Sequence, residues 1–179
     1  ESAQNKVASI GRRDPDHVFG TNPCSEIILR PYQFCNLTEV VVRAEDNMTT
    51  LAKKVILATQ LGTYQASLTD FRYLRKIWKH NTEEERLLGV SLTGILDNSI
   101  LSTVGQDLVS LLGGLKEVAI KSNTKLSKEL DINASTAITC VKPSGTVSQL
   151  VDSASGIHPR HSEYYIRTVR GDNKDPLTQ

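Results

Sequence analysis

Apolar and polar positions along this chain follow two periodicities, one typical of strands and one typical of helices. Residues 37–42 (LTEVVV) are rich in β-branched side chains, which favours a strand. Thr49 or Thr50 is then predicted to cap a helix. The apolar residues of that helix recur at helical spacing, at Leu51, Val55, Ala58 and Leu61.

The first part of the chain is less regular. Residues 1–20 are mainly polar and are predicted to contain the end of a helix that runs into a loop, with a break at Pro15. Residues 26–29 are predicted to be extended. Further along, Thr82 is predicted to be the N-cap of a helix with acidic residues in its first turn, and residues 89–92 are predicted to be a short buried strand.

The second half repeats the alternation of helix and strand. A long helix is predicted from about Thr103 to Leu130, weakened by Gly113 and Gly114. A strand ending at Val141, a turn and a short helix from Thr146 follow. The alternation in residues 163–173 (EYYIRTVRGDN) predicts a last strand. Strands that alternate with helices indicate an α/β fold with mainly parallel strands.

Composition adds bounds to this picture. The chain has 179 residues, 39% of them hydrophobic, and a net charge of +1, as expected for one domain with a real core. No apolar run approaches the roughly 18 residues of a membrane span. The balanced charge argues against a nucleic-acid surface, and three cysteines are too few for a secreted disulfide framework. We therefore expect a cytoplasmic protein with free thiols and no membrane partner.

The start of the chain also carries information. It begins at Glu1, and its single methionine is Met48. We therefore expect the sequence to be part of a longer protein, cut within a domain because no Pro-rich or Gly/Ser-rich linker is present.

Cys24 and Cys35 are eleven residues apart, on either side of an apolar stretch. A zinc site would need four ligands, usually in close-spaced pairs, and no such pair exists in the sequence. Two buried cysteines acting as small hydrophobic residues are the simplest alternative. Against it, Asn22, Pro23 and Glu26 make a polar, restrained loop around Cys24. A thiol beside a carboxylate suits chemistry that removes a substrate proton while sulfur handles an electron or a hydrogen atom.

A second candidate site is the sequence KPSGTVSQL. Ser144, Gly145 and Thr146 would present hydroxyls and backbone N–H groups at the start of a helix, which favours an anion such as phosphate. The same residues also make a common turn followed by a helix cap. The other residues with reactive or aromatic side chains are interpreted as structural: His158, His161, Cys140, Tyr164, Tyr165 and Trp78.

The string Asn22-Pro23-Cys24-Ser25-Glu26-Ile27, with Cys35-Asn36-Leu37 after it, resembles the active-site finger loop of ribonucleotide reductases. The short gap between the cysteines is typical of the adenosylcobalamin-dependent class II enzymes. RLLGVSLTGILD, CVKPSGTVSQLVDSASGIHP and YYIRTVR are similar to later segments of that family, in the same order. The resemblance implies a part of a ten-stranded α/β barrel with the finger loop near the N-terminus, and residues 1–179 as a single partial catalytic domain.

The resemblance also implies roles for individual residues. Cys24 is expected to become a thiyl radical that abstracts the 3′ hydrogen of the ribose, and Glu26 to accept the 3′-hydroxyl proton. Asn22 is expected to position the substrate, and Cys35 to be half of the dithiol that reduces it. Four residues are expected to hold the substrate phosphates: Pro143, Ser144, Gly145 and Thr146. Adenosylcobalamin would be the radical source, with no metal site in this chain.

The departures from the family pattern imply partners. The cysteine that pairs with Cys35 should come from an earlier strand, and Cys140 is on the wrong strand for that role. Ser25 stands where many members of the family have glycine. We therefore expect the chain to need the missing upstream part of the barrel, in cis or as a separate chain, and a thioredoxin-like dithiol reductant. The alternatives are a non-catalytic split subunit that binds nucleotide phosphate and, more distantly, a metal-binding scaffold.

Overall fold

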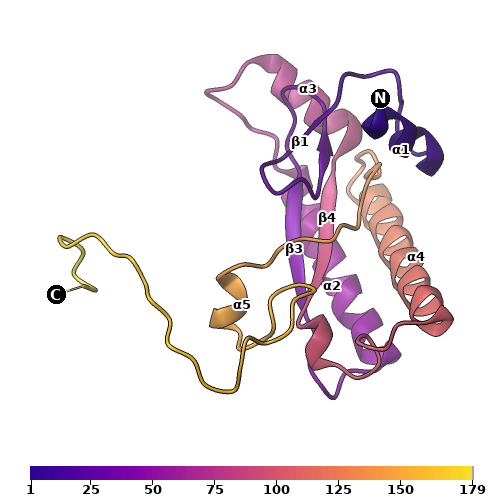
Figure 1. The fold of residues 1–179 in the computed structure, drawn as a ribbon. Helices are drawn as coiled ribbons and strands as arrows, with labels where there is room; N and C mark the ends of the chain where they lie inside the picture. The colour runs from indigo at the N-terminus through magenta and orange to yellow at the C-terminus, as the bar shows by residue number, and fades with distance from the viewer. Residues whose placement is uncertain (179) are drawn as a thin grey trace.

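The chain folds as an α/β unit in which helices pack on one face of a small parallel sheet (Figure 1). The computed structural model describes residues 1–178. Its elements in chain order are α1 (Ser2–Ile10), β1 (Gly20–Thr21), β2 (Ile28–Leu29), β3 (Asn36–Val41), α2 (Met48–Ser67), α3 (Lys76–Glu85), β4 (Leu88–Thr93), the short 3₁₀ helix η1 (Ile95–Asp97), α4 (Gln106–Glu129) and α5 (Val147–Leu150).

The centre of the fold is the parallel pair of β3 and β4. Their register runs from Asn36 opposite Leu88 to Val41 opposite Thr93. Residues 137–140 lie along the other edge of β4, where Thr139 bridges Val90 and the Cys140 N–H donates to the Val90 carbonyl over 3.0 Å. The order across the sheet is therefore β3, β4, then residues 137–140, all parallel. The predicted strands at 37–42 and 89–92 are confirmed within a residue or two.

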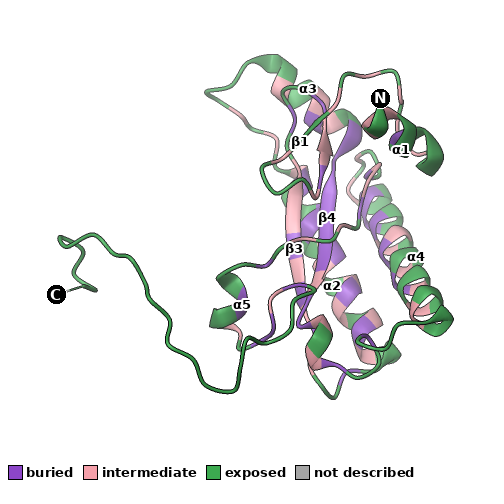
Figure 2. Ribbon diagram, viewed as in Figure 1, coloured by how far each residue is buried: buried purple, intermediate pink, exposed green. Residues whose placement is uncertain are grey.

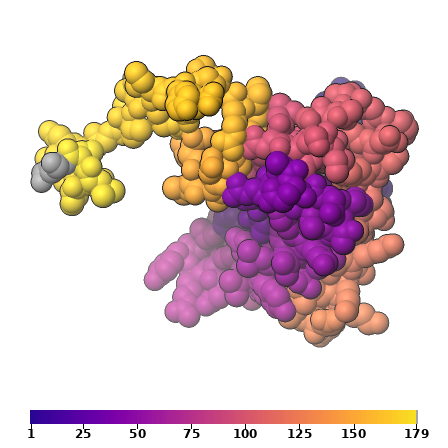
Figure 3. Space-filling view, turned by 90° about the horizontal axis from the view of Figure 1, so that it is seen from below, coloured from indigo at the N-terminus to yellow at the C-terminus, as the bar shows by residue number. Residues whose placement is uncertain are grey.

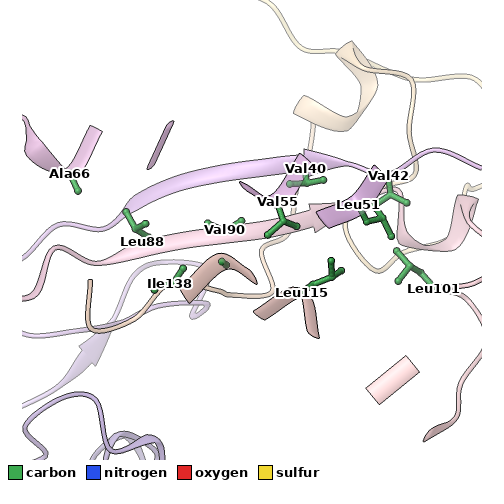
Figure 4. Close-up of a cluster of buried hydrophobic side chains, with 11 residues drawn as sticks. Val40, Val42, Leu51, Val55, Ala66, Leu88, Val90, Leu101, Leu115 and Ile138 are labelled. Atoms are coloured by element: carbon green, nitrogen blue, oxygen red, sulfur yellow. The ribbon is translucent and has the colours of Figure 1, made fainter. Parts of the chain in front are cut away.

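The hydrophobic core lies between this sheet and the helices α2 and α4 (Figure 4). Alternate residues of the strands point into it, and Val42, Leu51 and Leu88 are completely buried. Figure 2 shows the same division, with buried residues on β4 and on the inner sides of α2 and α4. Because successive side chains of a strand point to opposite faces, the remaining residues of β3 and β4 point to the face of the sheet away from the helices.

Helix α2 begins slightly earlier than predicted. Its N-cap is Asn47, whose side-chain oxygen accepts from the N–H groups of Thr49 and Thr50. Thr50 completes a capping box by accepting from the Asn47 N–H over 3.0 Å. The prediction of Thr49 or Thr50 as the cap was therefore wrong by two or three residues, because Asn47 reaches the same free N–H groups.

The prediction that Thr82 starts a helix was wrong. Thr82 lies near the C-terminal end of α3, which stops at Arg86 in a left-handed conformation with φ 42°. Acidic residues are normally unfavourable in the last turn of a helix, because the helix dipole places partial negative charge there. Here Glu84 and Glu85 are paired with arginines from residues 1–30, far away in the sequence. This tertiary pairing offsets the unfavourable dipole.

The C-terminal half contains one confirmed helix and one prediction that was wrong. Helix α4 continues through Gly113 and Gly114, since its apolar side packs on α2. Residues 163–173 are exposed and make no strand, because no neighbouring strand in the described part of the chain pairs with them. Figure 3 shows this C-terminal segment extending away from the body of the molecule. None of the helices within residues 1–178 is long and apolar enough to cross a membrane.

Candidate active site

The loop that carries Cys24 connects β1 to β2 in a short antiparallel hairpin. Gly20 pairs with Leu29 and Thr21 with Ile28. Asn22 closes the loop in three ways. Its N–H donates to the Ile27 carbonyl over 3.2 Å, its carbonyl accepts from the Ser25 N–H over 2.9 Å, and its side-chain oxygen accepts from the Ile27 N–H over 3.0 Å. Cys24 is exposed at the tip of this closed loop.

Ser25 explains why glycine suits the position after Cys24. Its φ is 61°, in the left-handed region that glycine adopts without strain and serine does not. The loop needs this conformation to turn back toward Ile27. A serine here is tolerated at a small cost in backbone energy.

The hairpin covers the face of the sheet opposite the helices, and Gly89 makes room for it. A Cβ atom at Gly89 would lie 3.1 Å from the Ile27 Cδ1 atom, 3.1 Å from the Cys140 Sγ atom, and in collision with Leu37. These three side chains therefore meet over the bare backbone of β4. Glu26, Cys35 and Cys140 are close enough on this face for their charges to influence one another. The structure thus brings together two of the predicted catalytic residues and adds Cys140.

Both covered thiols are held in the protonated state. Burial raises the pKa of the Cys35 thiol to about 12, and negative charge on Cys140 and Glu26 acts in the same direction. Burial likewise raises the pKa of Cys140 to about 11, again with a contribution from Glu26. One oxygen of Glu26, Oε2, is buried and has no hydrogen-bond partner in the described part of the chain. A hydroxyl group placed there would satisfy it.

These pKa values predict a dependence of stability on pH. In the unfolded chain a cysteine titrates near about 8.5, so above that pH the unfolded state loses protons that folded Cys35 and Cys140 retain. The free energy of unfolding should therefore fall as pH rises from about 8.5 toward 11. Urea unfolding at about pH 8 and about pH 10.5 measures the fall. Equal falls in the native chain and in a Cys35→Ala, Cys140→Ala double variant would contradict the assignment.

The predicted phosphate loop is tied to the same face of the sheet by Glu39 of β3. The Ser144 hydroxyl donates to Glu39 Oε1 over 2.5 Å, and the Lys142 ammonium lies 3.2 Å from Glu39 Oε2. Ser144 and Glu39 are both largely buried. The Ser144 hydroxyl hydrogen is therefore committed to Glu39, which leaves backbone N–H groups and Lys142 as the donors available to an anion.

The rest of that loop is open. Gly145 and Thr146 are exposed, Gly145 has φ 60°, and Thr146 caps the four-residue helix α5 without using its side chain. Pro143 precedes the turn. His158 and His161 are exposed and are remote in sequence from the thiols. Within residues 1–178, no group of three or more His, Cys, Asp or Glu side chains could hold a metal ion.

Sequence reasoning missed a buried polar cluster at the base of the hairpin. It consists of Arg13, Arg30, Gln33 and Glu85, all largely buried. Arg13 donates to both oxygens of Glu85, over 2.9 and 2.8 Å, and to the Ile28 carbonyl of β2 over 2.8 Å. Arg13 and Glu85 are 72 positions apart, so no local pattern indicates the pair.

Comparison with known proteins relates this chain to one group of enzymes. No protein-family model matches it. Among curated proteins, the "adenosylcobalamin-dependent ribonucleoside-triphosphate reductase" of Lactobacillus acidophilus is 32% identical over 189 residues, which cover 90% of this chain and 25% of the relative. The protein of the same name from Lactobacillus helveticus is 31% identical over 188 residues, with the same two coverages.

A solved structure agrees with these relatives. The crystal structure of a B-12 dependent (class II) ribonucleotide reductase superposes with a TM-score of 0.64 and 26% sequence identity, over 78% of this chain and 22% of that one. The chain spans about a quarter of the length of the curated relatives it matches.

Proposed function

The chain is a homologue of one part of the class II, adenosylcobalamin-dependent ribonucleotide reductases, and from this relationship we propose that it supplies the thiol loop and the phosphate loop of a ribonucleotide-reducing site. The observation that carries the proposal is their position on one face of the sheet. Glu26 lies in the hairpin loop and influences the thiol of Cys35, which directly precedes β3, and Glu39 of β3 holds Ser144 and Lys142. This arrangement supports a site in which one loop holds phosphate while the other reaches the sugar.

In the proposed reaction, Cys24 acts after its thiol has lost a hydrogen atom to the radical source, and the resulting thiyl radical takes the 3′ hydrogen atom of the ribose. Glu26 accepts the proton of the 3′ hydroxyl, and its buried, unpartnered Oε2 atom supports this role because a substrate hydroxyl would complete its hydrogen bonding. Asn22 shapes the loop through its side-chain oxygen, which leaves its amide N–H groups for the substrate.

Cys35 supplies reducing equivalents. Its raised pKa keeps the thiol protonated, so that it can deliver hydrogen to the substrate. Reduction by two electrons leaves a disulfide and needs a second thiol. Cys140 does not fit, because β4 lies between its segment and β3, and two strand spacings of about 4.8 Å exceed the roughly 7 Å limit between the Cα atoms of a disulfide. The partner thiol belongs to the remainder of the barrel, and a thioredoxin-like dithiol regenerates the pair.

The phosphates of the substrate bind at residues 143–146. The backbone N–H groups around Gly145, the free hydroxyl of Thr146 and the ammonium of Lys142 are the donors there, while Ser144 holds the loop to Glu39. An arriving phosphate would share Lys142 with the Glu39 carboxylate. The substrate is accordingly a ribonucleotide.

Adenosylcobalamin is the proposed cofactor, as the names of the relatives state for those proteins. The residues of this chain fit it in one respect: Cys24 is exposed at the loop tip, so the surface from Pro23 to Ser25 can face a bound radical source. When bound, the cofactor supplies the radical that oxidises a thiol. Free thiols also suit a reducing, cytoplasmic setting.

The rest of the ten-stranded barrel is the proposed partner, and this chain offers a surface for it. The outer edge of β3 pairs with no strand in the described part of the chain. Beside it, α2 and the residue that follows it expose a row of apolar side chains that line a groove with residues 37–41: Leu57, Leu61, Tyr64 and Leu68. An additional strand and helix would cover this edge and this row together.

Complementation tests the proposal. Deoxynucleotide formation is measured with a ribonucleotide, adenosylcobalamin and a dithiol, for this chain alone and together with the upstream remainder of the barrel. Turnover is expected only in the mixture, because the second thiol and the neighbouring strand come from the remainder. Turnover by the isolated chain, or none in a mixture that has assembled, would refute the proposal.

One observation favours a second function: the proposed phosphate loop is anchored to Glu39 within this chain, whereas Cys35 has no suitable partner thiol among residues 1–178. The chain would then be a non-catalytic subunit that binds nucleotide phosphate. Nucleotide binding that persists in a Cys24→Ala variant, without a radical signal when cobalamin is added to the assembled native protein, would identify that function.

A further inference from the structure

The base of the hairpin that carries Cys24 is held by a buried ion cluster. Glu85, at the end of α3, is 4% exposed and accepts hydrogen bonds from Arg13 on both of its oxygens. Gln33 also donates to it, and the Arg30 Nε atom lies 3.3 Å from its Oε2 atom. Glu85 thus serves both buried guanidinium groups, and Arg30 also pairs with Glu84 over 2.9 Å.

Arg13 joins this cluster to the hairpin itself. Its third donor, Nη1, reaches the carbonyl of Ile28 over 2.8 Å, and its guanidinium lies 5.0 Å from the ring centre of Phe19, next to β1. Ile28 follows Ile27, whose side chain lies beside the Cys140 thiol over the bare backbone of Gly89. Through its own carbonyl, Glu85 accepts from the Thr136 N–H over 3.0 Å at the start of the segment that leads to Cys140.

We propose that Arg13, paired with Glu85, is the positioning residue that holds the Cys24 hairpin against the sheet. The planar guanidinium makes two bonds to the carboxylate and one to β2 at the same time, which a single ammonium cannot do. Loss of these bonds frees the base of the hairpin next to α3 and the adjoining end of β4 (Figure 1). Ile27 then uncovers Cys140, while the core between the sheet and α2 is untouched.

Thiol labelling of the full chain tests this docking without relying on catalysis. The three cysteines are labelled with a neutral maleimide and quantified by mass spectrometry. In the native chain exposed Cys24 should react fast, and Cys140 slowly because it is half-buried beside Ile27 and its pKa is raised. Arg13→Met should speed Cys140 labelling by about tenfold or more, and Arg13→Lys should give an intermediate rate. Lys54→Met, which removes an ion pair with Asp46, is the matched control and should leave Cys140 slow.

The dependence on urea separates local release from general destabilisation. Below the unfolding transition, the faster Cys140 labelling in Arg13→Met should be nearly insensitive to urea, since undocking a hairpin exposes little surface. Cys140 labelling at the native rate in both Arg13 variants would overturn the proposal. So would a faster rate that rises steeply with urea, or an equal increase in Lys54→Met.

The catalytic consequence rests on the proposed function. In the assembled enzyme, Arg13→Met should lower kcat about tenfold or more and leave the KM for the ribonucleotide nearly unchanged, because the phosphate loop keeps its contacts to Glu39. Should the native assembly show no turnover, the proposed function fails while the labelling result still decides the positioning role. A rise in KM with kcat unchanged would refute the catalytic consequence.

Discussion

Replacing Cys24 by alanine should abolish deoxynucleotide formation in the assembled enzyme, with a loss of at least about 1,000-fold in kcat. Cys24 is the exposed thiol at the tip of the closed loop, whereas Cys35 and Cys140 are half-buried and have raised pKa values. No other side chain of this loop can take the hydrogen atom. The measurement is turnover with adenosylcobalamin and a dithiol, combined with nucleotide binding to verify that the site remains intact.

Cys140→Ala is the matched control for that experiment. It removes a thiol of similar surroundings to Cys35, but one separated from it by β4. We expect turnover within about threefold of the native value, since the Cys140 thiol takes no part in the proposed two-electron reduction. Native turnover by Cys24→Ala would exclude Cys24 as the radical thiol, and loss of turnover in Cys140→Ala would give Cys140 a role that its strand position does not predict.

Replacing Glu85 by glutamine should lower the free energy of unfolding by roughly 3 kcal/mol or more. The substitution keeps the shape of the side chain but removes the charge that neutralises Arg13 and Arg30. Burial alone would raise the pKa of Glu85. Hydrogen bonds from Arg13 and Gln33 and the charges of both arginines lower this pKa by more, so it lies below its usual range. The carboxylate is therefore charged at neutral pH, and its loss leaves buried Arg13 without a carboxylate partner and Arg30 with Glu84 alone.

Glu84→Gln gives a sharp comparison with that variant. Glu84 is the preceding residue, pairs with Arg30 over 2.9 Å, and has a side chain that is 49% exposed. An ion pair in such contact with water contributes at most about 1 kcal/mol. Urea unfolding at neutral pH measures both variants. Equal losses of stability in the two would show that the burial of Glu85 does not decide its contribution.

Predicted elements whose pattern rests on neighbouring residues were largely confirmed, whereas two predictions that depend on contacts between residues far apart in the sequence were wrong. The strands at 37–42 and 89–92 and the helices after them were predictable, because apolar periodicity is recorded in neighbouring residues. The helix start at Thr82 was wrong because Glu84 and Glu85 are stabilised by arginines from the first 30 residues. The strand at 163–173 was wrong because a strand needs a neighbour, and the pattern of one segment cannot provide it.

The sequence by itself determined which chemical groups are available. The motif around Cys24 and the turn at residues 143–146 are each contiguous, so the sequence alone predicts a thiol loop and an anion loop. Only the tertiary structure decided how they are arranged. Contacts between residues 72 to 105 positions apart pair Arg13 with Glu85 and Glu39 with Ser144, and partial burial raises the pKa of Cys35. Charge pairing and desolvation depend on distance in space, which the order of residues along the chain does not specify.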